Sequence, residues 1–190
     1  MISYALIDTA IGFAGIAWAE AGLVACHLPE PGAETARRSF LRRFPDAVEA
    51  SVPHALEATA CGIQALMRGE KADLTAAPLD LARTPDFHAK VYEIARAIPP
   101  GETRAYGEIA VELGDKLLAR DVGAALGQNP WPIVVPCHRV TAAGGKLGGF
   151  SARGGVNTKV RLLAIEGAKV LQPPPPKLRP RQAPQPSLFD

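Results

Sequence analysis

The stretch from Ile133 to Val140 constrains this chain more than any other, because it joins a strand-like run to a chemically active group. It begins with Ile133–Val135, an apolar β-branched run of the kind that fills a buried strand. Pro136 has no N–H to donate, so it is expected to end the strand ladder. The pattern therefore predicts that Cys137 stands where a buried strand becomes a loop, a usual place for a reactive group.

The two residues after Cys137 favour a reactive cysteine. His138 and Arg139 are expected to create a positive potential, which lowers the pKa of a thiol toward the thiolate. The alternative is an inert core cysteine, since free cysteine is among the most buried residue types. Two adjacent basic residues are unusual for an inert cysteine, and we therefore predict a nucleophile.

The chain holds three cysteines, Cys26, Cys61 and Cys137, without close pairing. This argues against a disulfide framework and a CxxC zinc site, and no metal and no cofactor is predicted. Cys26 and Cys61 lie in patterns typical of core positions, and a reducing compartment suits all three. No apolar run is long enough to cross a bilayer and no signal sequence is present, so we expect a cytoplasmic protein without a membrane partner.

Composition is that of a globular protein, with 47% hydrophobic and 21% charged residues. The net charge of +2 is unevenly distributed: residues 1–82 carry 6 Lys and Arg against 10 Asp and Glu, whereas residues 83–169 carry 12 against 8. The second region is the candidate anion-binding half, although its excess of positive charge alone is a weak signal for nucleic acid.

Residues 1–83 are predicted to form a first, small unit. Strands are expected at 3–7, 13–19 and 22–28, followed by helices at 33–43 and 53–68. Strands followed by helices indicate an α/β or α+β unit. Nothing in this region resembles a catalytic group.

Residues 84–169 are predicted to form a second, mainly helical unit. Helices are expected at 84–98, 106–113, 118–126 and 157–166. A tight turn containing Gly114 joins the middle two, which is typical of a helix-turn-helix, with a plain αα-hairpin as the alternative. The proline-rich residues 170–190 are predicted to be a disordered tail.

The helix predicted at 118–126 consists mostly of small apolar residues such as Ala124. Apart from Arg120 near its start, it lacks the Asn, Gln, Lys and Arg side chains with which major-groove readers recognise base edges. Small residues instead let a backbone approach closely, as a narrow minor groove requires. The pattern predicts binding to double-stranded DNA that is largely independent of base sequence.

Two further segments flank the cysteine. The side chain of Asn129 is predicted to hold a stiff turn with the following Pro130. The glycine-rich loop at 143–155 lacks the phosphate-binding pattern, and with Phe150 it is predicted to form a pocket wall.

Three motifs in order carry a resemblance to a known family: Asn129-Pro130, Pro136-Cys137-His138-Arg139-Val140 and Leu163-Ala164-Ile165-Glu166-Gly167. Together they resemble the O6-alkylguanine-DNA alkyltransferases, or methylated-DNA–protein-cysteine methyltransferases. The resemblance is strong from Thr84 to Ala168 and diffuse over residues 1–83. It implies a ribonuclease-H-like α/β domain at 1–83, and a helix-turn-helix, winged-helix-like domain at 84–169 that binds the minor groove.

The resemblance also implies an activity, with roles for particular residues. A monomeric protein would take the alkyl group from O6-alkylguanine, and from O4-alkylthymine, once per molecule. Cys137 would accept the alkyl group, His138 would take the thiol proton through a water, and Glu166 would orient His138.

Other family positions concern the DNA and the base. Tyr106 would assist base rotation, Arg120 would fill the gap left in the duplex, and Asn129 would be the hinge. The resemblance further places Ala124 at the DNA, and it assigns the substrate pocket to Tyr106, Leu126, Val140, Phe150 and Ser151.

Two departures leave the preferred alkyl size open: Phe150 stands where many members have tyrosine, and the loop 151–157 is slightly long. Members that only bind lesions have tryptophan in place of Cys137, which favours an active enzyme. A non-catalytic lesion-binding or regulatory helix-turn-helix protein and a Cys-His hydrolase are the alternatives.

Near the end of the chain, Gln185, Leu188 and Phe189 resemble the short peptide by which bacterial repair proteins bind the sliding clamp. The alternative is an ordinary terminus, because such motifs are short.

Overall fold

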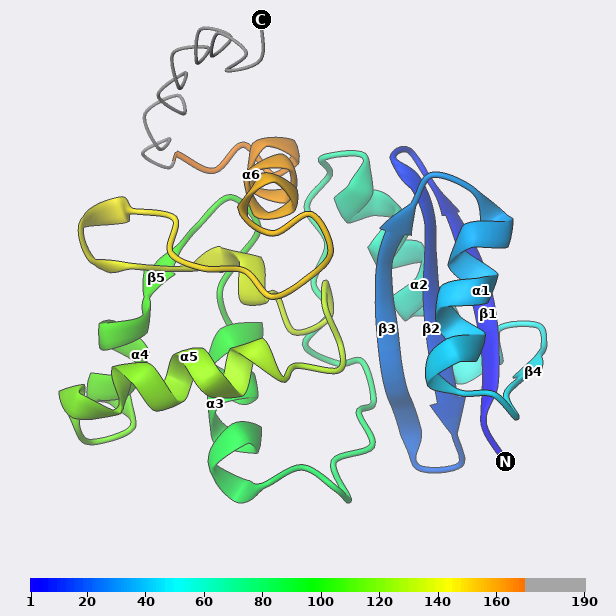
Figure 1. Ribbon diagram of the computed structural model, residues 1–190, viewed down its shortest axis with the longest axis horizontal. Helices are drawn as coiled ribbons and strands as arrows, with labels where there is room; N and C mark the ends of the chain where they lie inside the picture. Colours follow the sequence, from blue (N-terminus) through cyan, green and yellow to red (C-terminus); the bar gives the residue numbers. More distant parts are fainter. Residues whose placement is uncertain (170–190) are drawn as a thin grey trace, which may run out of the picture.

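The computed structural model describes residues 1–169. The predicted proline-rich tail, with the clamp-like residues Gln185, Leu188 and Phe189, lies outside the described residues. An α/β unit with a small sheet comes first along the chain, and a mostly helical part follows it (Figure 1).

The N-terminal sheet is built from three long strands and one short one. Its order is β3-β2-β1-β4, in which β1 runs antiparallel to β2 and parallel to β4. The bounds are β1 Ser3–Thr9, β2 Gly12–Ala19, β3 Gly22–Glu30 and β4 Val48–Glu49. The three predicted strands are confirmed: β1 and β3 end two residues later than predicted, and β2 begins one residue earlier. Strand β4 was not predicted, because two residues carry no periodic signal.

Two helices cover opposite faces of this sheet (Figure 1). Helix α1, Ala33–Arg43, places Phe40 against Tyr4 and Ala17, and helix α2, His54–Met67, packs with Ile7 and Ile16. Side chains alternate across a strand, so Ile16 and Ala17 serve different helices. Both predicted helices are confirmed.

The second part of the chain is built from short helices around a small parallel strand pair. Helix α4 and helix α5 are joined by a turn and a 3-10 segment, as the helix-turn-helix pattern predicted, and each predicted helix is found within three residues of its expected bounds. The elements are α3 Asp86–Arg96, β5 Arg104–Ala105, α4 Tyr106–Glu112, η1 Lys116–Leu118, α5 Ala119–Gly127, η2 Cys137–Arg139, β6 Val140–Thr141, η3 Ala143–Gly145 and α6 Val156–Ile165.

The prediction of a strand at Ile133–Val135 is wrong. These residues form a tight turn, closed by a hydrogen bond of 2.7 Å from the N–H of Val135 to the carbonyl of Trp131. Ile133 has φ 77°, a backbone region that β-branched residues rarely adopt. All three side chains are buried. The apolar run correctly indicated burial, but burial does not distinguish a strand from a buried turn.

One continuous apolar core joins the sheet to the helical part. It runs from Ile16 and Leu23 in the sheet, through α2, to Tyr92 and Trp131. The indole N–H of Trp131 donates a hydrogen bond of 2.7 Å to the carbonyl of Leu23 in β3, so the turn before Cys137 is anchored on the sheet. Within residues 1–169, no helix has the length and apolar character needed to span a membrane.

Candidate active site

Cys137 is the first residue of the 3-10 segment η2, and it lines a cavity of about 540 Å³ between α4, α5 and the glycine-rich loop. Four of the five predicted pocket residues line this cavity: Tyr106, Leu126, Phe150 and Ser151. Val140 does not, because its side chain is fully buried in β6. The sequence interpretation missed the small residues that leave the space open, namely Ala119, Gly123, Gly127 and Gly149.

Asn129 ties the end of α5 to the segment before Cys137. Its Nδ2 donates a hydrogen bond of 2.8 Å to the carbonyl of Val135, and its Oδ1 accepts one of 2.9 Å from the N–H of Trp131. These two bonds span the turn in which Ile133 adopts its unusual conformation. Asn129 therefore holds the turn as predicted, and its role as a hinge stays a prediction.

His138 is buried against Glu166, which lies just after the last turn of α6. The two side chains are 1% and 2% exposed, and His138 Nε2 lies 2.9 Å from Glu166 Oε1. The same carboxylate accepts hydrogen bonds from Nε and Nη2 of Arg139, at 3.0 Å and 2.8 Å. The backbone of Gly101 fits closely here: at φ 86°, a Cβ on this residue would lie 2.9 Å from the carbonyl oxygen of Glu166.

The protonation states follow from burial and these bonds. Burial raises the pKa of Glu166, but hydrogen bonds from His138 and Arg139 outweigh it and bring the pKa to about 2. Burial lowers the pKa of His138, against the opposing effect of Glu166. At neutral pH a neutral His138 thus donates its Nε2 proton to an ionised Glu166, which leaves Nδ1 as a proton acceptor.

The predicted route from Cys137 to His138 is not a direct one. In the described part of the chain, His138 Nδ1 is buried without a hydrogen-bond partner, and no hydrogen bond joins it to Cys137. The predicted proton transfer through a water therefore stays a prediction.

The cation that acts on Cys137 is not the one that the sequence suggested. Arg139 is paired with the carboxylate of Glu166, and His138 is neutral. The expectation that these two side chains lower the pKa of the Cys137 thiol is therefore wrong. Burial raises the pKa of Cys137; a hydrogen bond from Asn129, the charge of Lys159 and backbone N–H groups oppose the rise.

Lys159 was missed in the sequence because its place in a polar run of α6 looks like a solvent position. Its side chain is fully buried, and Nζ donates hydrogen bonds of 2.6 Å to the carbonyl of Val140 and 3.4 Å to the carbonyl of Gly149. Nζ also lies 5.7 Å from the centre of the Tyr106 ring. Burial lowers the pKa of Lys159 to about 8, so its charge is titratable near neutral pH. Spacing of apolar residues alone could not have found it.

Tyr106 opens helix α4 and forms one wall of the cavity. Burial raises the pKa of its hydroxyl, which donates a long hydrogen bond of 3.5 Å to the carbonyl of Gly149. Gly148, at φ 68°, lies so close that a Cβ would be 3.2 Å from the ring. The glycine-rich loop therefore packs against Tyr106 by its backbone.

Of the three residues predicted to contact DNA, Tyr106 lines the cavity of Cys137, and the other two lie on the exposed side of α5. Arg120 and Ala124 are both exposed, and within residues 1–169 Arg120 makes no ion pair. Neither lines the cavity of Cys137, whereas Ala119, Gly123 and Leu126 on the same helix do. Helix α5 thus has one face exposed to solvent and another that lines the cavity of Cys137.

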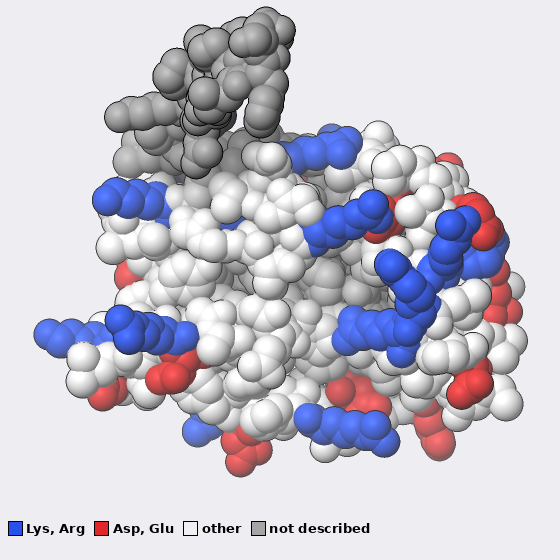
Figure 2. All heavy atoms as spheres, viewed as in Figure 1, with Lys and Arg blue, Asp and Glu red and all other residues white. Residues whose placement is uncertain are grey.

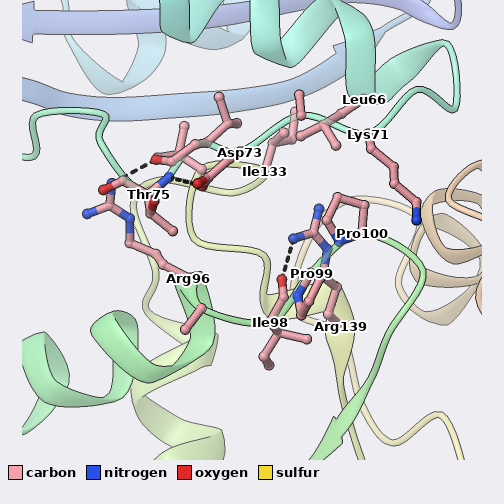
Figure 3. Close-up of a pocket in the computed structure, with 14 residues that line it drawn as sticks. Leu66, Lys71, Asp73, Thr75, Arg96, Ile98, Pro99, Pro100, Ile133 and Arg139 are labelled. Atoms are coloured by element: carbon pink, nitrogen blue, oxygen red, sulfur yellow. Dashed lines mark hydrogen bonds between the residues drawn. The ribbon is translucent and has the colours of Figure 1, made fainter.

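A second cavity, of about 440 Å³, is lined in part by Arg139 and has no cysteine in its lining. Figure 3 shows Arg139 reaching the carbonyl of Ile98 along one wall, a hydrogen bond of 2.6 Å. Arg96 on another wall binds the carbonyls of Leu74 and Thr75. This cavity explains how Arg139 is held in place, and the reactive site is the cavity of Cys137.

Within residues 1–169, no three His, Cys, Asp or Glu side chains are grouped to hold a metal ion.

Residues 86–168 match a family model described as "6-O-methylguanine DNA methyltransferase, DNA binding domain". Along its length, the chain is similar to the methylated-DNA–protein-cysteine methyltransferase of Mycobacterium tuberculosis, with 38% identity over 169 residues that cover 89% of this chain and 94% of the relative. It is also 30% identical over 156 residues to the protein of the same name from Methanothermobacter thermautotrophicus, covering 82% of this chain and 80% of that one.

Solved structures give the same picture. The crystal structure of Mycobacterium tuberculosis O6-methylguanine methyltransferase superposes with a TM-score of 0.66 and 37% identity, covering 88% of this chain and 93% of that chain. A structure of Mycobacterium tuberculosis OGT in complex with DNA superposes with a TM-score of 0.66 and 36% identity, covering 86% and 92%.

Proposed function

The chain belongs to the methylated-DNA–protein-cysteine methyltransferase family, and we propose that it repairs DNA by transferring the alkyl group of O6-alkylguanine to Sγ of its own Cys137. The observation that carries this proposal is the pairing of an open cavity at Cys137 with a buried, ionised Glu166 that orients His138. A nucleophile, a proton acceptor and an orienting carboxylate are the parts that activate a cysteine.

The reaction balances with the residues of the site. Sγ of Cys137 forms a bond to the alkyl carbon while the bond from that carbon to O6 breaks, and its electron pair goes to the guanine. The thiol proton passes through a water to Nδ1 of His138, and the ionised Glu166 stabilises the resulting imidazolium. The guanine that is released takes up one proton from solvent, and the imidazolium returns its proton to solvent. A thioether is not cleaved by acid–base groups, so each molecule acts once.

Lys159 and Tyr106 assist this reaction in the proposal. The buried Lys159 cation stabilises the thiolate of Cys137, because a nearby opposite charge favours an ionised form. Tyr106 bounds the space that the base enters, and its ring also faces Lys159. O4-alkylthymine fits the same chemistry, since its alkyl carbon is likewise bound to an exocyclic oxygen.

The protein is proposed to bind double-stranded DNA as a monomer, with the exposed face of α5 in the minor groove. Its small residues, among them Ala124, permit close approach, and Arg120 fills the gap left by the flipped nucleotide. Flipping costs about a few kcal/mol, least for a poorly paired lesion. The scarcity of base-reading side chains on α5 supports recognition that is largely independent of base sequence.

Two finer assignments belong to the same proposal. The mixed sheet, with β1 parallel to β4, supports a ribonuclease-H-like unit at residues 1–83, and the β5–β6 pair beside the helix-turn-helix supports a winged-helix-like unit at 84–169.

Clamp binding through Gln185, Leu188 and Phe189 is also proposed, and it is tested by deleting residues 185–190. An unchanged affinity for the sliding clamp in a titration would contradict it.

The function is tested by incubating the protein with duplex DNA that carries O6-methylguanine and weighing the intact protein. We expect the wild type to gain the mass of one methyl group, Cys137→Ala to show no gain, and Cys61→Ala to keep it. Cys61 does not line the cavity, and it is exposed, so the prediction of a core position for it was wrong. Lesion binding without an adduct would favour a non-catalytic binder. Turnover of an ester or a peptide would favour a hydrolase.

A further inference from the structure

A third cavity, of about 450 Å³, lies between strand β3 and the segment that leads into α6. Three arginines from three different elements line it: Arg43 at the end of α1, Arg153 in the glycine-rich loop and Arg161 in α6. Neither Cys137 nor Tyr106 borders it, so it is separate from the cavity of the reactive cysteine.

The charge of this cavity is positive and largely uncompensated. Glu30 is the one acidic residue in its lining, and both of its carboxylate oxygens lie 3.1 Å from Nη1 of Arg153. Within residues 1–169, Arg43 and Arg161 make no ion pair. Two free guanidinium groups therefore face a space of the size that a small anion and its attachments occupy.

The surface near this cavity carries several basic side chains. Figure 2 shows Lys and Arg side chains gathered around the hollow between the sheet with α1 and the helical part, with few acidic side chains beside it. Arg43 is held at its place by its own neighbour, since its guanidinium carbon lies 5.1 Å from the centre of the Phe44 ring. Guanidinium groups bind phosphate oxygens with fixed geometry, so a cavity lined by several arginines suits a phosphate better than an apolar ligand.

The helix-turn-helix itself offers little positive charge for DNA. Its exposed cations are Lys116 and Arg120, and Lys146 lies on the nearby loop. Recognition that does not read bases depends on contacts to phosphates, which supply most of the affinity. Further cations outside the helix-turn-helix are thus required by the physics of such binding.

We propose that the cavity of Arg43, Arg153 and Arg161 binds a phosphate of the DNA backbone, on a stretch of duplex that extends from the helix-turn-helix toward the N-terminal unit. This inference rests on the proposed function only in taking DNA as the substrate. It makes the junction of the two units a second point of contact with the duplex, and it gives the N-terminal unit a part in holding DNA.

The test measures the dissociation constant for an unmodified duplex at salt concentrations from about 50 to about 200 mM, for the full chain and for Arg43→Gln with Arg161→Gln. Loss of one phosphate contact reduces the slope of log affinity against log salt by about 0.9, so the slope of the double variant should be about 0.9 smaller than that of the wild type. Over this fourfold range of salt, the wild type should therefore lose about three- to fourfold more affinity than the variant.

The matched control is Arg68→Gln with Arg83→Gln, which removes the same charge from exposed positions that do not line the cavity. The control should keep the wild-type slope. Equal slopes in both double variants would overturn the proposal, because net charge alone would then account for the change. The proposal would also be overturned if the cavity variant kept the wild-type slope while its unfolding transition showed that it is folded like the wild type.

Two further readouts separate this inference from the proposed function. Failure of the wild type to take a methyl group from lesion DNA would refute the function, whereas the slope on unmodified duplex tests the cavity alone. Inorganic phosphate distinguishes a free anion from a DNA phosphate: if it binds the wild type and the DNA slopes do not differ, the cavity holds a small anion and the DNA proposal is wrong.

Discussion

Two buried cations flank the reactive segment, and the protein treats them in opposite ways. Arg139 is 4% exposed, and its charge is neutralised by Glu166 at 2.8 Å. Lys159 is fully buried, and its partners are two carbonyl groups and the face of Tyr106. Arg139 therefore has a structural role, whereas the uncompensated charge of Lys159 acts on Cys137. The sequence had indicated Arg139, because it lies two residues after the cysteine.

Removing the compensating carboxylate should have the largest effect. In Glu166→Gln, Arg139 would keep its charge in a buried position without a counter-charge, and we expect a loss of about 3–5 kcal/mol in the free energy of unfolding. Glu70→Gln, which breaks the exposed pair with Arg68, should have a much smaller effect, because water and salt screen that pair. Urea unfolding measures both, and similar losses would show that the Glu166 pair is not energetically special.

The same carboxylate sets an acid limit on stability. The folded-state pKa of Glu166, about 2, lies below its ordinary value of 4.5, so its contribution is complete above pH 4.5 and disappears as the pH falls toward 2. The difference in unfolding free energy between wild type and Glu166→Gln should shrink across this window. A constant difference would mean that the carboxylate is protonated at neutral pH.

Lys159→Met should separate stability from reactivity. Methionine keeps the volume and removes a buried, uncompensated charge, so stability should be equal or higher. The rate of methyl transfer from lesion DNA should fall by about tenfold or more, since losing the cation raises the pKa of the Cys137 thiol. Lys90→Met, an exposed change on α3, should leave the rate unchanged. A stable variant with a wild-type rate would remove Lys159 from the mechanism.

The stability of the wild type should also rise with pH where that of Lys159→Met does not. The pKa of Lys159 falls from 10.5 in the unfolded chain to about 8 in the folded protein, so the unfolded state binds more protons between these values. Stability therefore increases as the pH rises from about 8 toward 10.5, relative to the methionine variant. Unfolding at three pH values measures it, and parallel curves would contradict the burial of a charged lysine.

The smallest effect is expected at Tyr106. Tyr106→Phe keeps the ring face toward Lys159, so stability should change by less than about 0.5 kcal/mol. Tyr106→Leu removes the cation–π contact, worth about 0.5–1 kcal/mol, and should lower the pKa of Lys159 slightly. Titration of the lysine by NMR compares the two, and identical values in both variants would exclude the ring from the environment of Lys159.

Much of the architecture could be read from local pattern. The alternation of residues 3–28 predicted three strands, and apolar spacing with glycine and proline boundaries predicted six helices. These signals are local, since a strand or helix repeats its own period along the chain. The motif around Cys137 likewise identified the family, and the pairing of His138 with Glu166 came from that resemblance and is matched by a 2.9 Å contact.

What local pattern could not supply depends on residues far apart in sequence. Ile133–Val135 look like a strand, but Asn129 and the Trp131 bond to β3 impose a turn. Whether a cation is neutralised depends on which carboxylate the fold brings near it: Glu166 meets Arg139 from 27 residues away, and no carboxylate meets Lys159 in the described chain. The chain's order thus determined its elements and its reactive cysteine, and packing determined which cation acts there, because charge is compensated through space and not along the sequence.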